Sequence, residues 1–549
     1  MRFARSLCLL AACLLPPLAL ADKQTVCTIT INSADEQKTF KRFLSPEKYN
    51  FVELVERKRP DWLGSACEQK VSCDVLLISG HHGEGNVFFS DALERGEHLE
   101  IAELERVTCS DSCPSLFANL KEVYLFGCDT MNPTAQHTVS EEITRSFLRE
   151  GKSPAEALRL TSALRAQRGE SSRDRMRLVF KDVPVIYGFS SAAPLGPSAA
   201  GTLNRYFQAT GPGEVGKGRP SGGLLKQFSA QGMVAGRGIA AGDPLTPLRQ
   251  DVCNFANERM TVAQKLDSVH QLMRRPVAES RLLLDRIESF TRTLDAGKRQ
   301  EPEVTQALTR ISADGETRDR YLAFARDADQ PETRARMINV AHAVGWLSSQ
   351  QRTDEHLRMI GDMLARKAVS GSEVGLACAI NKDGSLDGGL KRLTTAAGQS
   401  DTVGHAAVLA CMGSTEARTR ALQGLVSSAD ADVRVAQFYL RHRPISDADE
   451  VRTVTKAIAG MHGPEAQARA LDVLARHYLS DRESVDTLKK LYAKTGAWGV
   501  QNAIAGVLLR ADPKTARDTD VLRTLREFRL KSLPEGNMVD ALIERLRIS

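Results

Sequence analysis

Two short segments each place a reactive side chain directly after an apolar run. Residues 76–83 read LLISGHHG, and the second histidine, His82, precedes Gly83. Residues 123–130 read VYLFGCDT and present Cys128 after a glycine. A cysteine reacts as its thiolate, and histidine is the side chain best suited to take the thiol proton near neutral pH. The two segments therefore predict a nucleophilic Cys128 with His82 as its proton acceptor.

Both reactive residues are expected at the carboxyl ends of buried parallel strands. Residues 75–78 and 122–126 are almost continuously apolar, as is typical of strands covered on both faces. His82 and Cys128 lie 46 positions apart, which leaves room for a crossover helix between neighbouring strands. The carboxyl ends of parallel strands share one edge of a sheet, where loops converge into active sites. The pattern predicts that the two side chains meet there.

The rest of the first two hundred residues alternates between strand and helix patterns. Strands are expected at 25–31, 50–55, 86–89 and 183–187, and helices at 34–44, 138–148 and from 153 onward. Strands separated by helical segments predict a mostly parallel sheet flanked by helices, which we assign to residues 22–210.

Taken together, the two reactive segments resemble the caspase-like superfamily of cysteine peptidases. In that superfamily one apolar strand ends in His-Gly and a later one in Gly-Cys or Ala-Cys. The Cys-Asp-Thr run at 128–130 is similar to the caspase-related CHAT domains of clan CD, as are the helix at 140–148 and the run VIYGFS at 185–190. The resemblance implies an α/β caspase-like fold and a cysteine endopeptidase that uses a His-Cys dyad on protein or peptide substrates, without a cofactor or metal.

The resemblance also implies a role for each matching residue. Cys128 matches the nucleophile, and His82 matches the histidine that protonates the leaving amine. The backbone N–H groups of Gly83 and Cys128 would form the oxyanion hole, in which each donor typically contributes about 3–4 kcal/mol. His81 departs from the family pattern, and we expect it to be structural.

The substrate pocket is predicted less specifically. Its candidates are Asp129, Ser190 and Ser191. A serine hydrolase is a weaker alternative, because GFSSA at 188–192 nearly fits a nucleophile elbow but Pro194 follows it and no helix is expected there. A metal site is not expected, since the chain has no Cys-x-x-Cys pair and no His-Glu-x-x-His run.

The second half of the chain shows only helical patterns. Residues 211–250 are rich in Gly, Pro and Ser and predict a linker. Within 251–549, EARTRAL at 416–422 returns as EAQARAL 49 positions later, and ETRARM at 332–337 is a looser copy. A period of roughly 40–47 residues resembles HEAT-like solenoids, with an irregular helical domain as the alternative. The resemblance implies an all-α surface that docks a protein partner or substrate.

The first residues predict export. A basic start, an apolar run at 6–18 and the Ala-Leu-Ala sequence at 19–21 are typical of a signal peptide, expected at 1–21. The run LAAC at 10–13 resembles a lipoprotein cleavage box and is the alternative. No later stretch reaches about 18 apolar residues, so no transmembrane segment is expected in the mature chain. We expect a periplasmic or secreted protein.

The cysteine content agrees with export. Nine of the 11 cysteines follow the predicted signal peptide, and an odd number fits one working thiol and eight disulfide-bonded residues. The bridges expected from proximity are Cys67–Cys73, Cys109–Cys113 and Cys378–Cys411, with buried thiols as the alternative.

The net charge of +6 is too small for this length to indicate nucleic acid. The predicted function is an exported cysteine endopeptidase, with an inactive interaction scaffold as the alternative.

Overall fold

The computed structural model describes residues 23–54, 63–83, 87–90, 98–109, 113–134, 140–149, 151–168, 171–397, 402–445, 447–531 and 537–548. The predicted signal peptide and the lipoprotein box lie outside these residues. The chain divides into two compact units. The first, here called the sheet unit, comprises Met1–Arg286 and Ala296–Ala307, and the second, the helical unit, comprises Ile287–Asp295 and Leu308–Ser549.

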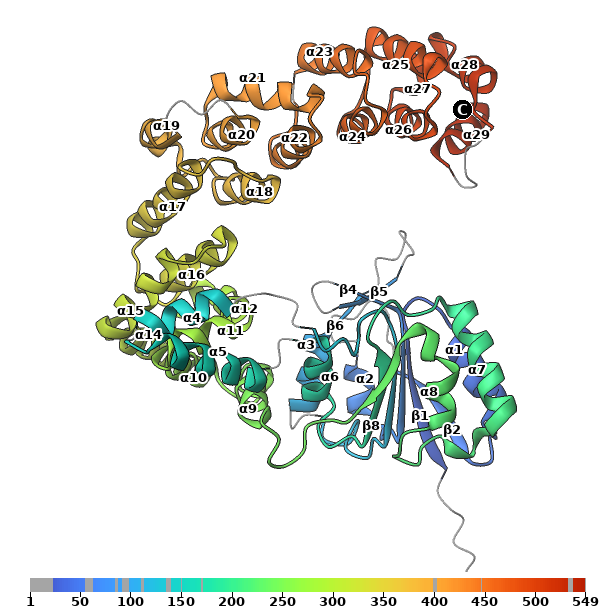
Figure 1. Ribbon diagram of the computed structural model, residues 1–549, viewed down its shortest axis with the longest axis vertical. Coiled ribbons are helices and arrows are strands. Elements are labelled where there is room, and N and C mark those ends of the chain that lie inside the picture. Colours follow the sequence, from blue (N-terminus) through green and yellow to red (C-terminus); the bar gives the residue numbers. More distant parts are fainter. Residues whose placement is uncertain are drawn as a thin grey trace, which may run out of the picture. The chain divides into compact units, whose positions relative to one another are not determined.

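A six-stranded, mostly parallel sheet forms the centre of the sheet unit, as the sequence predicted. Its strand order is β2-β1-β3-β7-β8-β9, and only β9 runs antiparallel to its neighbour (Figure 1). The three central strands are buried at every position. The strands are β1 (Gln24–Thr30), β2 (Tyr49–Glu53), β3 (Val75–Ser79), β7 (Glu122–Phe126), β8 (Val185–Phe189) and β9 (Met233–Gly236).

Helices cover both faces of the sheet, because alternate residues of its strands point to opposite sides. On one face Leu76 and Ile78 pack in a core with α2 (Gly64–Glu68), α3 (Ile101–Cys109) and α6 (Ser172–Val179). On the other face Leu77 and Tyr124 pack in a core with α1 (Asp35–Phe43), α7 (Gly196–Thr210) and α8 (Gly222–Gln227). Figure 1 shows α1, α7 and α8 together on one side of the strands.

Residues 211–250 fold as part of the sheet unit, and not as the linker that their composition predicted. They contain α8, and they contain β9, which pairs along β8. The N–H groups of Gly216, Lys217 and Gly218 bind the buried carboxylate of Glu122 at 2.9, 2.9 and 3.0 Å. Gly216 and Gly218 have positive φ, a conformation that glycine adopts without strain, so at these positions the glycines fit a turn of the fold.

A helical hairpin interrupts the sheet topology between β7 and α6. Its helices α4 (Ser140–Arg149) and α5 (Pro154–Arg168) share an apolar cluster with α11 (Val277–Leu282). The cluster consists of Ile143, Phe147, Ala157, Leu164 and Ala278. The other helices that follow the sheet are α9 (Thr246–Ala256), α10 (Val262–Arg274), α12 (Leu284–Arg292) and α13 (Ala296–Gln300).

From residue 302 onward the described residues form helices and connecting turns, as predicted. In one row α22 packs on α24, α24 on α26 and α26 on α29, and in a second row α23 packs on α25 and α25 on α28. The helices are α14 (Pro302–Ala313), α15 (Gly315–Arg326), α16 (Pro331–Ala343), α17 (Ser349–Leu364), α18 (Gly371–Ile380), α19 (Leu390–Ala397), α20 (Val403–Cys411), α21 (Thr415–Gln423), α22 (Asp430–His442), α23 (Ala448–Ala459), α24 (Pro464–Leu474), α25 (Arg482–Lys494), α26 (Trp498–Leu508), α27 (Pro513–Asp518), α28 (Val521–Phe528) and α29 (Met538–Ile548).

The sequence echo does not mark equivalent helices of this array. Its two clear copies lie on α21 and α24. Figure 1 draws α21 on the side of α23 and α25, and α24 on the side of α22 and α26. The echo therefore reports a shared amphipathic helix pattern and not one structural period.

Eight cysteines form four disulfides, but the two expected local bridges are wrong. The pairs are Cys27–Cys73, Cys67–Cys113, Cys109–Cys253 and Cys378–Cys411. The last pair was predicted correctly. The other three join residues that are far apart in the sequence. For example, Cys27 lies on β1, which pairs with β3, and it bonds to Cys73, two positions before β3 begins.

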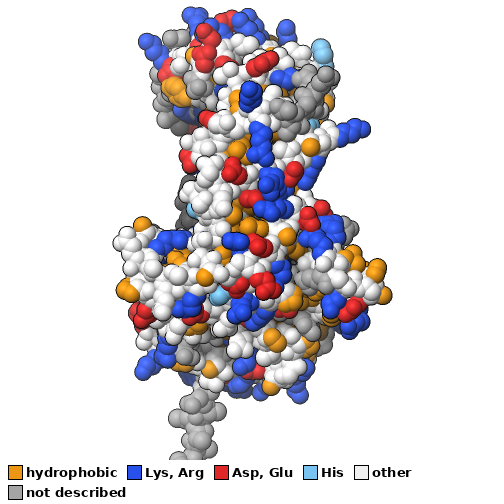
Figure 2. Space-filling view, turned by 90° about the vertical axis from the view of Figure 1, so that its left-hand side faces the viewer, with side chains coloured by type: hydrophobic (Ala, Val, Ile, Leu, Met, Phe, Trp, Pro, Cys, Tyr) orange, Lys and Arg blue, Asp and Glu red, His pale blue; other side chains and the backbone are white. Residues whose placement is uncertain are grey.

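Charged side chains of both signs lie on the surface that Figure 2 draws. Figure 2 shows basic and acidic side chains interspersed over the face that it draws, in agreement with the small net charge. Within the described ranges, none of the helices combines the length and the apolar character that a membrane crossing requires.

Candidate active site

Cys128 lies in the turn directly after β7, at the carboxyl edge of the sheet. It is partly exposed, and among the described cysteines it alone is outside a disulfide. Its Sγ accepts a hydrogen bond from the backbone N–H of Ala193 at 3.3 Å. Asp129 follows with a φ of +54°, which turns the chain sharply after the thiol. The predicted nucleophile is therefore a free thiol at the expected edge, held by a backbone donor.

His82 reaches Cys128 from a second, smaller sheet. This three-stranded antiparallel sheet consists of β4 (His81–Gly83), β5 (Val87–Phe89) and β6 (His98–Glu100), and Gly80 alone separates the end of β3 from the start of β4. The His82 side chain has only 4% of its surface exposed, and its Nδ1 lies 2.9 Å from the carbonyl oxygen of Cys128. The structure thus brings the two predicted dyad residues into direct contact.

The contact fixes where the imidazole can take a proton. A carbonyl oxygen only accepts hydrogen bonds, so Nδ1 must carry the hydrogen, and the neutral ring of His82 then has its lone pair on Nε2. Nε2 is buried and has no hydrogen-bond partner among the described residues. None of the described residues therefore donates a hydrogen bond to the nitrogen that is able to act as a base.

The surroundings of His82 favour its neutral form. Burial lowers the pKa of His82 below the ordinary 6.5, the Cys128 carbonyl and the charge of Asp129 oppose this shift, and the positive charge of Arg175 adds to it. An imidazole with a lowered pKa is neutral at pH 7. His82 is accordingly in the protonation state that a general base needs.

Gly127 makes the close approach of the two segments possible. A Cβ atom at this position would lie 2.8 Å from the Gly80 carbonyl oxygen, 2.9 Å from Cβ of His82 and 3.1 Å from the ring of Phe88. No side chain fits between these groups. The glycine before the nucleophile is thus a steric requirement of the contact between His82 and the Cys128 turn.

The three pocket candidates lie on two loops that are hydrogen-bonded to each other. The N–H of Asp129 donates to the Ser191 carbonyl at 2.9 Å, and its carboxylate accepts from the Asn132 amide at 2.9 Å. The hydroxyl and the N–H of Ser190 both donate to the Gly232 carbonyl at 3.0 Å. Since the Ser190 hydroxyl is bonded to a carbonyl, the serine-hydrolase alternative gains no support.

His81 and Gly83 point to the face of β4 opposite His82, as strand alternation requires. The His81 ring packs on Phe89 with ring centroids 5.4 Å apart, which fits the structural role that we expected for it. Gly83 pairs with Val87, and a Cβ at Gly83 would lie 3.3 Å from the Phe89 ring. Its role as an oxyanion donor remains a prediction.

Two groups that contribute to the site were not identified from the sequence. The hydroxyl of Thr130 donates to the Gly127 carbonyl at 3.1 Å and accepts from the Phe189 N–H at 3.1 Å, which ties the ends of β7 and β8 together. The Cys-Asp-Thr run contained this signal, because a buried hydroxyl needs partners. The Ala193 N–H leaves no signal in a sequence, since every residue except proline has one.

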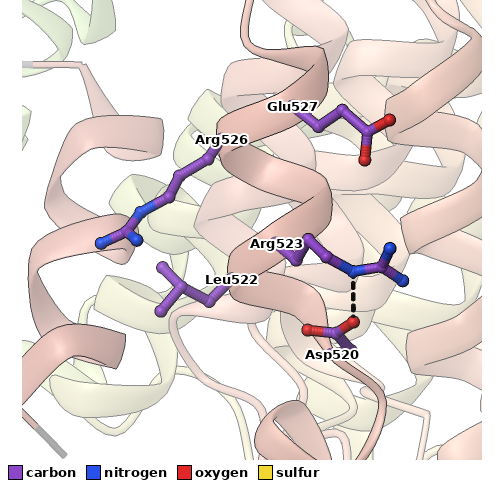
Figure 3. Close-up of a pocket in the computed structure, with 5 residues that line it drawn as sticks. All are labelled: Asp520, Leu522, Arg523, Arg526 and Glu527. Carbon is purple, nitrogen blue, oxygen red and sulfur yellow. Dashed lines mark hydrogen bonds and ion pairs between the residues drawn. The ribbon is translucent and has the colours of Figure 1, made fainter.

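Two further features of the described residues concern other kinds of site. No group of three or more His, Cys, Asp or Glu residues that could hold a metal occurs in them. A surface hollow of the helical unit, shown in Figure 3, is lined by side chains of α28 and the residue before it, and Arg523 pairs with Asp520 there. It contains neither Cys128 nor His82.

A scan against protein-family models, a search of curated proteins and a search of solved structures each found no match to this chain. Its function is therefore inferred from its own residues.

Proposed function

We propose that this chain is a cysteine endopeptidase of caspase-like type, with Cys128 as nucleophile and His82 as the acid–base residue. The observation that carries the proposal is the 2.9 Å contact between His82 Nδ1 and the Cys128 carbonyl, where two adjacent parallel strands end. A free, partly exposed thiol beside a buried neutral imidazole is the combination that nucleophilic catalysis needs.

The proposed reaction has two halves, in which Cys128 first forms a thioester with the substrate and water then hydrolyses it, with His82 transferring protons in both. Sγ of Cys128 attacks the carbonyl carbon of the scissile peptide bond, and the thiol proton moves to Nε2 of His82. The N–H groups of Gly83 and Cys128 are the proposed donors to the oxyanion. The C–N bond breaks as His82 returns the proton to the leaving amine. Water, deprotonated by His82, then hydrolyses the thioester and restores the thiol.

We further propose that the protein is periplasmic or secreted, with its helical unit as a HEAT-like docking surface for a protein substrate or partner. The four disulfides support an oxidising compartment, because such bonds are rare in reducing ones. The stacked rows α22–α24–α26–α29 and α23–α25–α28 support a surface of the repeat type.

The test is active-site labelling with a panel of peptide electrophiles. We expect labelling to disappear in Cys128→Ala and to slow by about 100-fold or more in His82→Gln, as general acid–base groups typically contribute 10²–10⁴-fold. His81→Gln is the matched control, because it removes the adjacent histidine on the other face of β4, and it should label at the wild-type rate. Equal labelling of the His82→Gln and His81→Gln variants would contradict the proposed dyad.

A catalytically inactive scaffold is the second candidate, and one observation favours it. The hydrogen bond to the Cys128 sulfur comes from the Ala193 N–H, and Nε2 of His82 forms none with the sulfur. An inactive site predicts that Cys128 alkylates at the rate of an ordinary exposed thiol, whether or not His82 is present. The labelling series above therefore separates the two functions.

A further inference from the structure

The hydroxyl group of Thr130 lies just beyond the point where the regular pairing of β7 with β8 ends. The last pair of that ladder is Tyr124 with Tyr187. Two residues further along β8, the N–H of Phe189 donates to Thr130 Oγ1 at 3.1 Å, and the Phe189 carbonyl accepts from the Met131 N–H at 2.9 Å. The Thr130 hydroxyl thus supplies an acceptor that the β7 backbone no longer offers.

The same hydroxyl fixes the peptide bond that precedes the nucleophile. Thr130 is fully buried, and its Oγ1 donates to the Gly127 carbonyl oxygen at 3.1 Å. A peptide bond is planar and trans, so the carbonyl of one residue and the N–H of the next point in opposite directions. Holding the Gly127 carbonyl therefore also fixes the direction of the Cys128 N–H. No hydrogen bond joins that N–H to another described residue, and it is one of the two proposed oxyanion donors.

Close packing leaves the Thr130 hydroxyl little room to move. A Cβ atom at Gly188 would lie 2.6 Å from Thr130 Oγ1 and 2.6 Å from Cγ of Met131, so the turn after the nucleophile packs directly on the backbone of β8. The hydroxyl is therefore held between a donor on β8 and an acceptor next to Cys128.

On the basis of the proposed function, we infer that Thr130 is a positioning residue, whose hydroxyl aims the Cys128 N–H at the oxyanion of the tetrahedral intermediate. It acts through the peptide bond between Gly127 and Cys128 and not on the substrate itself. The oxyanion exists only after Sγ has attacked the carbonyl carbon, so the contribution belongs to the transition state and not to substrate binding. Loss of the hydroxyl should therefore lower kcat and leave KM almost unchanged.

The test compares two reactions of the Cys128 thiol in the full chain. A peptide aldehyde takes Sγ at its carbonyl carbon, and the electron pair of the C=O double bond moves to the oxygen, which then occupies the position of the oxyanion. Iodoacetamide is attacked at a saturated carbon and releases iodide, so its reaction forms no oxyanion.

Thr130→Val replaces the hydroxyl by a methyl group of similar size. It should weaken aldehyde binding, and lower kcat for the corresponding peptide amide, by about ten-fold or more, since a whole oxyanion donor typically contributes about 10²–10³-fold. The rate of alkylation by iodoacetamide and its pH profile should stay close to those of the wild-type protein, because the thiol and His82 are unchanged.

Three further variants separate positioning from folding. Thr130→Ser keeps the hydroxyl and should restore most of the aldehyde affinity. Thr202→Val is the matched control, because the buried Thr202 on α7 likewise donates to a backbone carbonyl, that of Ser198 at 3.1 Å, and accepts from Arg205 at 2.9 Å. It should change neither reaction. If Thr130→Val does not fold, Thr130→Ala lacks the same hydroxyl and provides the comparison.

The outcomes distinguish the inference from the proposed function. Equal loss of aldehyde binding and of alkylation in Thr130→Val would assign the hydroxyl a structural role only and would overturn the inference. Unchanged aldehyde binding in that variant would overturn it as well, and in both cases the peptidase would stand. If neither aldehydes nor the other peptide electrophiles react with Cys128 of the wild-type protein, the proposed peptidase fails and the inference fails with it.

Discussion

At the scale of single residues, the candidate site depends on the absence of a side chain at Gly127. The backbone carbonyl of Gly80 is the closest obstacle to a Cβ there, and a main-chain atom cannot rotate away as a side chain can. Gly127 is thus needed for two reasons. It lets β4 pack against the edge of the sheet, and it lets His82 contact the turn that contains Cys128.

Gly127→Ala should therefore destabilise the sheet unit and slow Cys128 labelling together. Overpacking of this kind typically costs about 1–3 kcal/mol, and the displaced β4 would carry His82 away from Cys128. Denaturation midpoints and labelling rates measure the two effects. Gly213→Ala is the control, because a Cβ at Gly213 meets nothing within 4 Å. A variant at Gly127 that loses neither stability nor labelling would show that the close approach is not required.

At the scale of elements, the sequence predicted the strands that are buried on both faces. The apolar runs before His82 and Cys128 form β3 and β7, and these strands are neighbours, as the spacing of the two residues allowed. Between β3 and β7 the chain adds the small β4–β6 sheet before α3, so more than a crossover helix lies there. Short strands such as β4 and β9 are three or four residues long, too short to show a period.

The predictions for residues 211–250 and for the disulfides were wrong for one physical reason. In both cases the structure depends on partners that are distant in the sequence. The carboxylate of Glu122 holds the 216–218 turn across more than ninety positions, and Cys109 bonds to Cys253 and not to its neighbour Cys113. Composition and spacing report local preferences only. The side chains of the site were accessible to sequence reasoning because each needs a particular residue type, whereas the backbone donor of Ala193 does not.

Helix α17 of the helical unit carries a buried group whose titration should limit stability in acid. The side chain of His356 is 5% exposed, and burial, with smaller contributions from the charges of Arg352 and His342, lowers its pKa to about 4. Above pH 6.5 both the folded and the unfolded forms are neutral. Between pH 6.5 and about 4 only the unfolded chain binds the proton, so stability must fall as pH falls.

The expected loss across that window is about 3 kcal/mol, at 1.36 kcal/mol for each pK unit. Urea unfolding of the wild-type protein, followed by the helical signal at pH 7 and at pH 4.5, measures it. His356→Gln should be less dependent on pH over this range, and His462→Gln, which changes an exposed histidine, should behave as the wild type does. Equal pH dependence in all three proteins would contradict a neutral buried His356.

At the scale of the whole molecule, the nine described cysteines divide into one free thiol, which we propose for catalysis, and four disulfides. Three of the bridges lie in the sheet unit and one in the helical unit. A titration, in denaturant and without reduction, of the protein that lacks residues 1–21 should therefore give one thiol, and none in Cys128→Ala. Additional thiols in the denatured wild-type protein would contradict the four-bridge pattern, and with it the support for an oxidising compartment.

The bridges should also contribute unequally, because the entropy that a disulfide removes from the unfolded chain rises with the length of the loop it closes. Cys109–Cys253 spans 144 positions and Cys378–Cys411 spans 33. The chain-entropy relation gives about 5 kcal/mol for the first and about 3.7 kcal/mol for the second. Replacing both cysteines of each bridge by Ala, and following denaturation of each unit, tests this order. The order would be contradicted if the helical unit lost more stability than the sheet unit. The longest bridge joins α9 to α3, and α3 packs against the sheet that positions His82 and Cys128. Reduction of the disulfides should therefore slow labelling of Cys128, even though Cys128 itself forms no disulfide.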